Sequence, residues 1–176
     1  MKERVVVKIT EEKVLARIGE IAEEINRDFG TEPIHLICIL KGSIFITCEI
    51  AKRLRGPVTM DFMSVSSYGD GTTSSGIVRI AKDLDESLEG KNVIVIEDIV
   101  DSGRTLSYLL EILSQRKPKC LKLCTLLDKP SRRVREVDVD YRGFEIPDYF
   151  VVGFGLDYAQ KYRNLPYIGC LEFIDE

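Results

Sequence analysis

The sequence predicts an α/β protein built on a parallel, twisted sheet with helices on both faces. Short apolar runs alternate along the chain with stretches whose apolar residues recur at helical spacing. The apolar runs, of which residues 34–40 are the clearest, lack the polar alternation of a strand with one solvated face, so both faces of the sheet should be covered. A length of 176 residues fits one domain, residues 1–176, whose core needs neither a metal nor a disulfide.

The individual elements are predicted from spacing and from the residues at their ends. Apolar residues recur at helical spacing from Val14 onward, between Thr10, which can cap a helix, and Gly30, which can end it. Ser43 can likewise cap a second helix, which Gly56 would stop. The predicted elements are, in order, strand 5–9, helix 10–30, strand 34–40, helix 43–54, strand 58–65, strand 92–96, helix 105–115, strand 121–127 and strand 149–153.

Composition and charge narrow the class of protein. The 25 basic and 29 acidic side chains give a net charge of −4, whereas a dedicated nucleic-acid binder usually has a basic excess. No long uncharged run could span a membrane, and the charged N-terminus does not resemble a secretory signal. We therefore expect a cytoplasmic protein with neither a nucleic-acid nor a membrane partner.

The thiols and the single imidazole are predicted to be structural. The five cysteines include no C-x-x-C pair, and most lie in apolar segments, so we expect reduced, buried thiols. His35, the only histidine, lies within the apolar run 34–40. A core histidine is a better interpretation than a metal ligand or a member of a catalytic relay.

Residues 97–105 are the segment that predicts chemistry. Glu97 and Asp98 follow the predicted strand 92–96, Asp101 comes three residues later, and a Ser-Gly-Arg-Thr turn then begins a helix. Ligands of parallel sheets bind at the carboxyl ends of strands, and amide groups of a glycine-containing turn at a helix start can hold a phosphate. The adjacent carboxylates suit a hydrated divalent cation or sugar hydroxyls. Neither the Walker A spacing nor G-x-G-x-x-G is present.

Residues 93–105 resemble the phosphoribosyl pyrophosphate signature of type I phosphoribosyltransferases. Further segments resemble hypoxanthine-guanine phosphoribosyltransferases and occur in that family's order: residues 40–43, 66–69, 129–131, 146–153, 156–158 and 162–166. The resemblance covers the chain from about 36 to 171. It implies the type I phosphoribosyltransferase fold, with a small hood from about residues 1–30 and 150–176. The implied reaction joins a 6-oxopurine to phosphoribosyl pyrophosphate and releases pyrophosphate.

The resemblance also implies a role for each site residue, with Mg²⁺ as cofactor. Asp101 is the implied general base at N7 of the purine, and the bond before Lys41 is often cis in the family. The implied metal ligands are Glu97, Asp98 and Asp157. The residues implied to bind phosphoribosyl pyrophosphate are Glu97, Asp98, Asp101, Ser102, Gly103, Arg104, Thr105, Lys41, Gly42 and Arg163.

The purine side of the site is implied in the same way. Lys129 would donate to O6, Phe150 would stack on the ring and Val151 would offer backbone groups, while Tyr149 departs from the lysine of several relatives. Residues 66–76 would form a mobile lid that excludes water, with the catalytic pair Ser67 and Tyr68 at its tip. Family members are commonly homodimers or homotetramers.

Three alternatives stay open from the sequence. An RNA-binding regulator of the same fold would need a basic surface, which the acidic balance disfavours. An enzyme of the same fold could use another base; Lys129 disfavours adenine, but xanthine is not excluded. A domain that binds a phosphorylated ligand without turnover would need neither the Ser67–Tyr68 lid nor Asp157.

Overall fold

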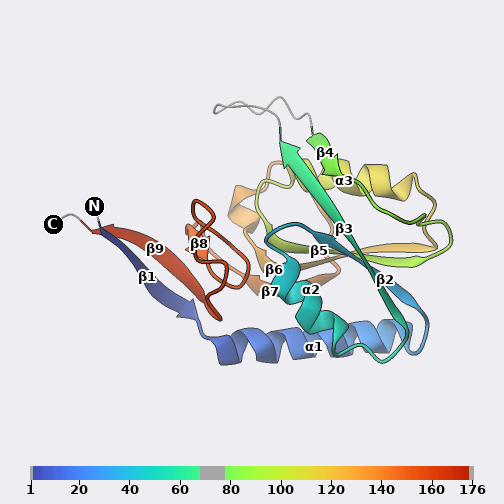
Figure 1. The fold of residues 1–176 in the computed structure, drawn as a ribbon, viewed down its shortest axis with the longest axis horizontal. Coiled ribbons are helices and arrows are strands. Elements are labelled where there is room, and N and C mark those ends of the chain that lie inside the picture. The colour runs from blue at the N-terminus through green and yellow to red at the C-terminus, as the bar shows by residue number, and fades with distance from the viewer. Residues whose placement is uncertain (1, 68–77, 175–176) are drawn as a thin grey trace.

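The main sheet has six strands in the order β4-β3-β2-β5-β6-β7, and all neighbours except β3 and β4 run parallel (Figure 1). The computed structural model describes residues 2–67 and 78–174. Its elements are β1 (Lys2–Ile9), α1 (Glu11–Phe29), β2 (Ile34–Ile39), α2 (Ile44–Ala51), β3 (Val58–Ser67), β4 (Val78–Lys82), β5 (Asn92–Val100), α3 (Arg104–Ser114), β6 (Cys120–Asp128), the 3₁₀ turn η1 (Pro130–Arg132), β7 (Tyr141–Glu145), β8 (Val151–Val152) and β9 (Ile168–Ile174).

Helices cover both faces of this sheet, as predicted. Side chains of α1 and α2 pack in one buried cluster with Ile94 and Ile96 of β5, whereas α3 packs in a second cluster with Val93 and Val95 of the same strand. Alternate residues of a strand point to opposite faces, so one apolar run supplies both cores. Figure 1 shows α1 and α2 on one side of the sheet and α3 on the other. None of the described helices is long and apolar enough to cross a membrane.

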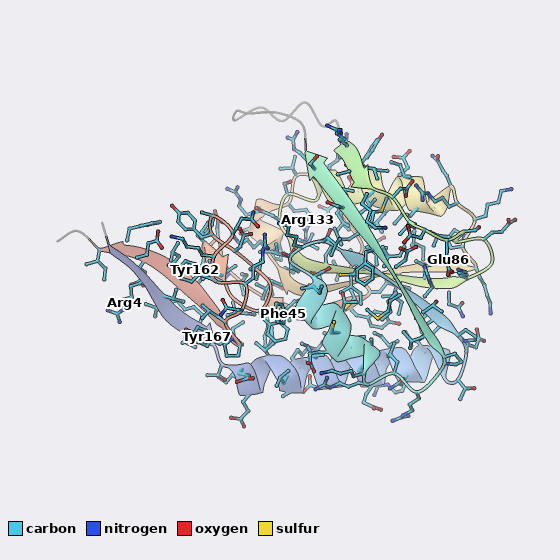
Figure 2. All side chains as sticks on the ribbon, viewed as in Figure 1. Arg4, Phe45, Glu86, Arg133, Tyr162 and Tyr167 are labelled. Carbon is cyan, nitrogen blue, oxygen red and sulfur yellow. The ribbon has the colours of Figure 1, made fainter. Side chains whose placement is uncertain are left out.

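A second, three-stranded sheet combines the two ends of the chain in the order β1-β9-β8. Strands β1 and β9 are antiparallel, with Lys2 opposite Ile174 and Val5 opposite Leu171. The sheet projects from the main body in Figure 1. Tyr162, which Figure 2 places beside this sheet, donates a hydrogen bond to the carboxylate of Glu3. Helix α1 comes from the same end of the chain but packs on the main sheet.

Several boundaries differ from the prediction. The side chain of Ser43 does not cap α2; it is buried, and its hydroxyl donates to the carbonyl oxygen of Ile39 at 2.6 Å. Strand β5 extends to Val100, because β6 continues to pair beside it, and β8 has only two residues. Strands β4, β7 and β9 were not predicted, since strand pairing depends on distant partners more than on local spacing.

The predicted structural roles of His35 and the cysteines can be compared directly with the structure. His35 is 2% exposed and its Nδ1 lies 2.7 Å from Oγ1 of Thr59, so the core assignment is confirmed. Burial lowers the pKa of its imidazole. All five cysteines are free, but the predicted burial is confirmed only for Cys38 and Cys124. Cys120 and Cys170 are half-buried, and Cys48 is exposed on α2 because that helix turns Ile46 and Ile50 to the core.

Candidate active site

Strand β5 carries two neighbouring carboxylates into the site. Glu97 and Asp98 lie within the strand rather than after it, which corrects the prediction, and Glu97 is opposite Thr125 of β6. Oδ1 of Asp98 accepts a hydrogen bond of 2.7 Å from the amide of Ile99. The two neighbouring carboxyl groups are close enough for the charge of Asp98 to act on Glu97.

Desolvation disfavours the ionised form of both carboxyl groups. Desolvation raises the pKa of Glu97 well above its usual range, and the neighbouring charge of Asp98 raises it further. Desolvation also raises the pKa of Asp98, against the opposing influence of the Arg163 guanidinium and of backbone amides. A bound cation or hydroxyl donors would stabilise the ionised form of these two adjacent carboxyl groups.

A cavity of about 180 Å³ lies where β5 passes into α3. Its lining residues are Glu97, Ile99, Val100, Asp101, Ser102, Gly103, Thr105 and Leu106. The structure therefore brings five of the predicted phosphoribosyl-binding residues around one cavity. Arg104, the first residue of α3, does not line it.

The turn that forms this cavity requires glycine at position 103. Gly103 has φ of 77°, and a Cβ atom there would lie 2.3 Å from the carbonyl oxygen of Arg135. The left-handed conformation turns the chain directly into α3, whose first amide groups have no partner within the helix. Ser102 Oγ accepts one of them, from Arg104, at 3.4 Å. Such a helix start favours an anion.

Asp101 is about half exposed at the mouth of this loop. Its Oδ1 lies 3.2 Å from Nε of Arg132, and its backbone oxygen accepts a hydrogen bond of 2.9 Å from Nη1 of Arg133. The sequence analysis missed both arginines. They directly follow the segment 129–131 that carries the family resemblance, and this proximity was the available signal.

The loop after β2 lies against Asp98 of β5. The peptide bond between Leu40 and Lys41 is cis, as the resemblance implied. A Cβ atom on Gly42 would lie 1.6 Å from Oδ2 of Asp98, so this glycine lets the loop rest directly on the β5 carboxylate. The loop and the acidic pair are thus in contact.

The segment 153–163 packs against that loop in an unusual conformation. A Cβ atom on Gly155, whose φ is 101°, would lie 1.9 Å from the carbonyl oxygen of Gly42. Phe154, Ala159, Gln160 and Tyr162 also have positive φ values. A positive φ costs conformational free energy in residues other than glycine, and such residues concentrate at functional sites. The segment is therefore a candidate part of the active site.

Three polar residues of this segment, Asp157, Gln160 and Arg163, contact one another. Arg163 Nη2 lies 2.9 Å from Oδ1 of Asp157, and Oε1 of Gln160 accepts from Nζ of Lys41 at 3.2 Å and from Arg163 at 3.3 Å. Lys41 and Arg163, both predicted to contact pyrophosphate, therefore share one acceptor. Gln160 carries no motif of its own and was missed by the sequence analysis.

The predicted purine residues gather around the end of β6. Lys129 is nearly buried, and its Nζ donates to the carbonyl oxygen of Tyr149 at 2.6 Å and to Oδ1 of Asp148 at 3.3 Å. Because the first contact is to a backbone oxygen, it does not depend on the side chain at 149. Phe150 is exposed and its ring meets that of Tyr158 edge-on at 5.7 Å, while Val151 is buried in β8.

Two parts of the predicted site are not assembled in the described structure. Among residues 2–67 and 78–174, no three His, Cys, Asp or Glu side chains form a cluster that could hold a metal, so Glu97, Asp98 and Asp157 do not make a closed metal cage. Ser67 ends β3, whereas Tyr68 and the rest of the predicted lid lie outside the described residues.

The comparisons with known proteins agree with this geometry. The model of the phosphoribosyl transferase domain family matches residues 7–159. The chain is 49% identical to the hypoxanthine phosphoribosyltransferase of Salmonella typhimurium over all of both chains, and 50% identical to the hypoxanthine-guanine phosphoribosyltransferase of Bacillus subtilis over 94% of this chain and 92% of the relative. A crystal structure of a hypoxanthine-guanine phosphoribosyltransferase from Bacillus anthracis superposes with a TM-score of 0.92 at 44% identity, covering 98% of this chain and all of that one.

The fold and these comparisons thus define a transferase of phosphoribosyl groups. The chain belongs to the phosphoribosyltransferase family. Within that family, the chain is similar along nearly its whole length to enzymes named for hypoxanthine and guanine.

Proposed function

We propose that this enzyme transfers the 5-phosphoribosyl group from phosphoribosyl pyrophosphate to N9 of hypoxanthine or guanine. The bond from C1′ to pyrophosphate breaks, the N9–C1′ bond forms, and the products are IMP or GMP and pyrophosphate. The observation that carries the proposal is the cavity formed by Asp101, Ser102, Gly103 and Thr105 at the end of β5, next to Lys129 at the end of β6. These two sites suit a 5′-phosphate and a 6-oxopurine.

The phosphate loop would hold the 5′-phosphate. The amide groups at the start of α3 and the hydroxyls of Ser102 and Thr105 are suited to its oxygens. The carboxylate of Asp101, at the mouth of the same loop, would accept the N7 proton of the purine as the transition state gains oxocarbenium character. A positioned general base of this kind contributes about 100- to 10,000-fold to a rate.

The loop after β2, around Gly42, would hold the leaving pyrophosphate. Lys41 and Arg163 supply cations from two different segments, and the loop around Gly42 can offer backbone amides. Gln160, which accepts from both cations, keeps them close together before the anion binds. Charge that develops on the leaving oxygens would thus be stabilised by groups already in place.

The acidic pair suits partial coordination of Mg²⁺ rather than a closed cage of protein ligands. Magnesium in phosphoryl and phosphoribosyl sites is usually held by one or two carboxylates together with substrate oxygens and water. Glu97 and Asp98 of β5, together with Asp157, would supply such partial coordination. Bound Mg²⁺ would neutralise charge on the pyrophosphate.

Selection of the base would depend on Lys129 and Phe150. Nζ of Lys129 is a donor held in position by Tyr149 and Asp148, and a donor is matched by O6 but not by the amino group of adenine. The exposed ring of Phe150 offers a flat surface for stacking. Val151 would add backbone groups at the purine edge. Xanthine also has O6 and remains a candidate base.

A competition assay tests this function and its alternatives. The protein is mixed with Mg²⁺, phosphoribosyl pyrophosphate and equal amounts of hypoxanthine, guanine, xanthine, adenine and uracil, and the nucleotides are separated. We expect IMP and GMP, and no product with a chelator present. Nucleotides of another base would overturn the purine assignment. Binding without any product would favour a regulator or a binding domain.

The lid role of Ser67 and Tyr68, the cytoplasmic location and the homodimeric or homotetrameric assembly stay predictions. The family resemblance supports the lid and the assembly, whereas the cysteine pattern and the charged N-terminus support the location. Each can be measured independently of turnover, for example by light scattering for the assembly.

A further inference from the structure

A buried ion pair lies directly behind the phosphate loop. The side chain of Asp128, the last residue of β6, is fully buried, and that of Arg133 is 9% exposed. Arg133 Nη2 donates to Oδ1 of Asp128, while its Nη1 donates to the backbone oxygen of Asp101 at 2.9 Å. Figure 2 shows Arg133 within the main body of the molecule. One planar guanidinium thus joins the end of β6 to the phosphate loop.

The residues next to Arg133 support the same loop. The amides of Val134 and Arg135 donate to the backbone oxygen of Ser102 at 2.9 and 3.0 Å. The carbonyl oxygen of Arg135 occupies the space that a side chain at Gly103 would need. The phosphate loop therefore rests on residues 133–135, which are about 30 positions away in the sequence.

Asp128 is a fixed anchor for this support. Its backbone oxygen accepts from the amide of Ile146 at 2.8 Å, and its Oδ2 lies 2.8 Å from Nε of Arg142. A buried carboxylate is unfavourable unless it is paired, and Arg142 or Arg133 could each supply a positive charge. Of these two arginines, Arg133 also donates to the backbone oxygen of Asp101.

We propose that Arg133 is a positioning residue that holds the main chain of Asp101, with Asp128 as its anchor. The orientation of the Asp101 carboxylate and of the phosphate-binding amides then depends on this guanidinium. The proposal rests on the roles given above to Asp101 and to the phosphate loop. The neighbouring Lys129, whose amide donates to the carbonyl oxygen of Val100 at 2.9 Å, is held by the same strand end.

The variant Arg133→Lys tests the proposal. Lysine keeps the positive charge beside Asp128, but a single ammonium on a shorter stem cannot serve both acceptors with the geometry of a guanidinium. We expect kcat/KM for phosphoribosyl pyrophosphate to fall about tenfold to hundredfold, as for a small misplacement of reacting groups. The dissociation constant of ribose 5-phosphate, measured by calorimetry, should rise about tenfold, whereas KM for hypoxanthine should change less than twofold.

Arg142→Lys is the matched control, because Arg142 pairs with the same carboxylate and does not contact Asp101. It should leave both constants within twofold of the parent enzyme. An equal loss in Arg142→Lys would mean that only neutralisation of Asp128 matters and would overturn the proposal. So would an Arg133→Lys enzyme with unchanged kcat and ribose 5-phosphate affinity.

A second variant covers the case in which Arg133→Lys does not fold, as judged by circular dichroism. Asp128→Asn retains the shape of the anchor and leaves Arg133 its contact with Asp101, so we expect the same direction of change at about threefold. An unchanged ribose 5-phosphate affinity in this folded variant would overturn the proposal. Asp101→Asn, measured in parallel, separates the outcomes: if it keeps full kcat, the proposed function of Asp101 fails, independently of Arg133.

Discussion

The two loops that we propose bind the phosphate and the pyrophosphate have the same place in the fold but different support. Each follows a buried parallel strand and contains a glycine that has no room for a side chain. Gly42 is hemmed in by the carboxylate of Asp98, a side chain of the active site itself. Gly103 is hemmed in by the carbonyl oxygen of Arg135, a backbone atom of a supporting segment.

Because of this difference, a side chain added to each loop should affect activity and stability to different degrees. A side chain added at Gly42 would displace a short carboxylate that is ready to act on a ligand. A side chain added at Gly103 would have to displace the main chain and adopt a left-handed conformation. The first loop should therefore be sensitive mainly in activity, and the second in both activity and stability.

The largest effect is expected from Asp101→Asn, which changes chemistry in the second loop without changing its shape. The amide cannot accept the N7 proton, so kcat should fall about 100- to 10,000-fold. KM for phosphoribosyl pyrophosphate should change little, because the amides of the loop remain. Steady-state kinetics measure both, and Lys41→Gln in the first loop should give the opposite pattern, mainly a raised KM. Equal losses of kcat and affinity in Asp101→Asn would assign it a binding role only.

Gly42→Ala should have the next largest effect. The new methyl group must push the Asp98 carboxylate aside, so kcat/KM for phosphoribosyl pyrophosphate should fall about hundredfold and the Mg²⁺ concentration for half-maximal rate should rise. The melting temperature should stay close to that of the parent. Gly19→Ala, a helical position with nothing within 4 Å of the new atom, serves as the control and should keep full activity. A large loss of stability in Gly42→Ala would erase the contrast between the loops.

Gly103→Ala tests the other side of the contrast. A left-handed alanine and a backbone collision should lower the free energy of unfolding by about 2–3 kcal/mol, and activity should fall with it. Urea denaturation measures the stability change. If this variant were as stable as the parent, residues 133–135 would not be a rigid support.

The smallest effect is expected from Lys129→Ala. Lys129 lies beside the second loop, and we propose that it contacts the purine. Removing a charged donor should raise KM for hypoxanthine about tenfold, while KM for phosphoribosyl pyrophosphate stays within about twofold. Initial rates at varied concentrations of each substrate measure both values. An unchanged hypoxanthine KM would remove Lys129 from the purine site.

The sequence by itself determined the layered α/β core, and it predicted the two loops that we propose bind the substrate. The spacing of apolar residues distinguishes a helix from a strand and shows whether a strand has one or two buried faces. The strands β2, β5 and β6 and the helices α1 and α3 were therefore predicted within a few residues of their ends. The phosphate loop was also readable, since its Ser-Gly-Arg-Thr order is a local feature.

Only the tertiary structure decided what holds these loops and how the ends of the chain pair. Lys2 of β1 lies opposite Ile174 of β9, and Arg133 reaches Asp101 across 32 positions. Gln160 likewise reaches Lys41 from a distant segment. Such contacts depend on strand register and on burial of charge by the assembled core, and neither is encoded in the spacing of neighbouring residues. Local sequence specifies the groups that act, and long-range packing specifies where they are held.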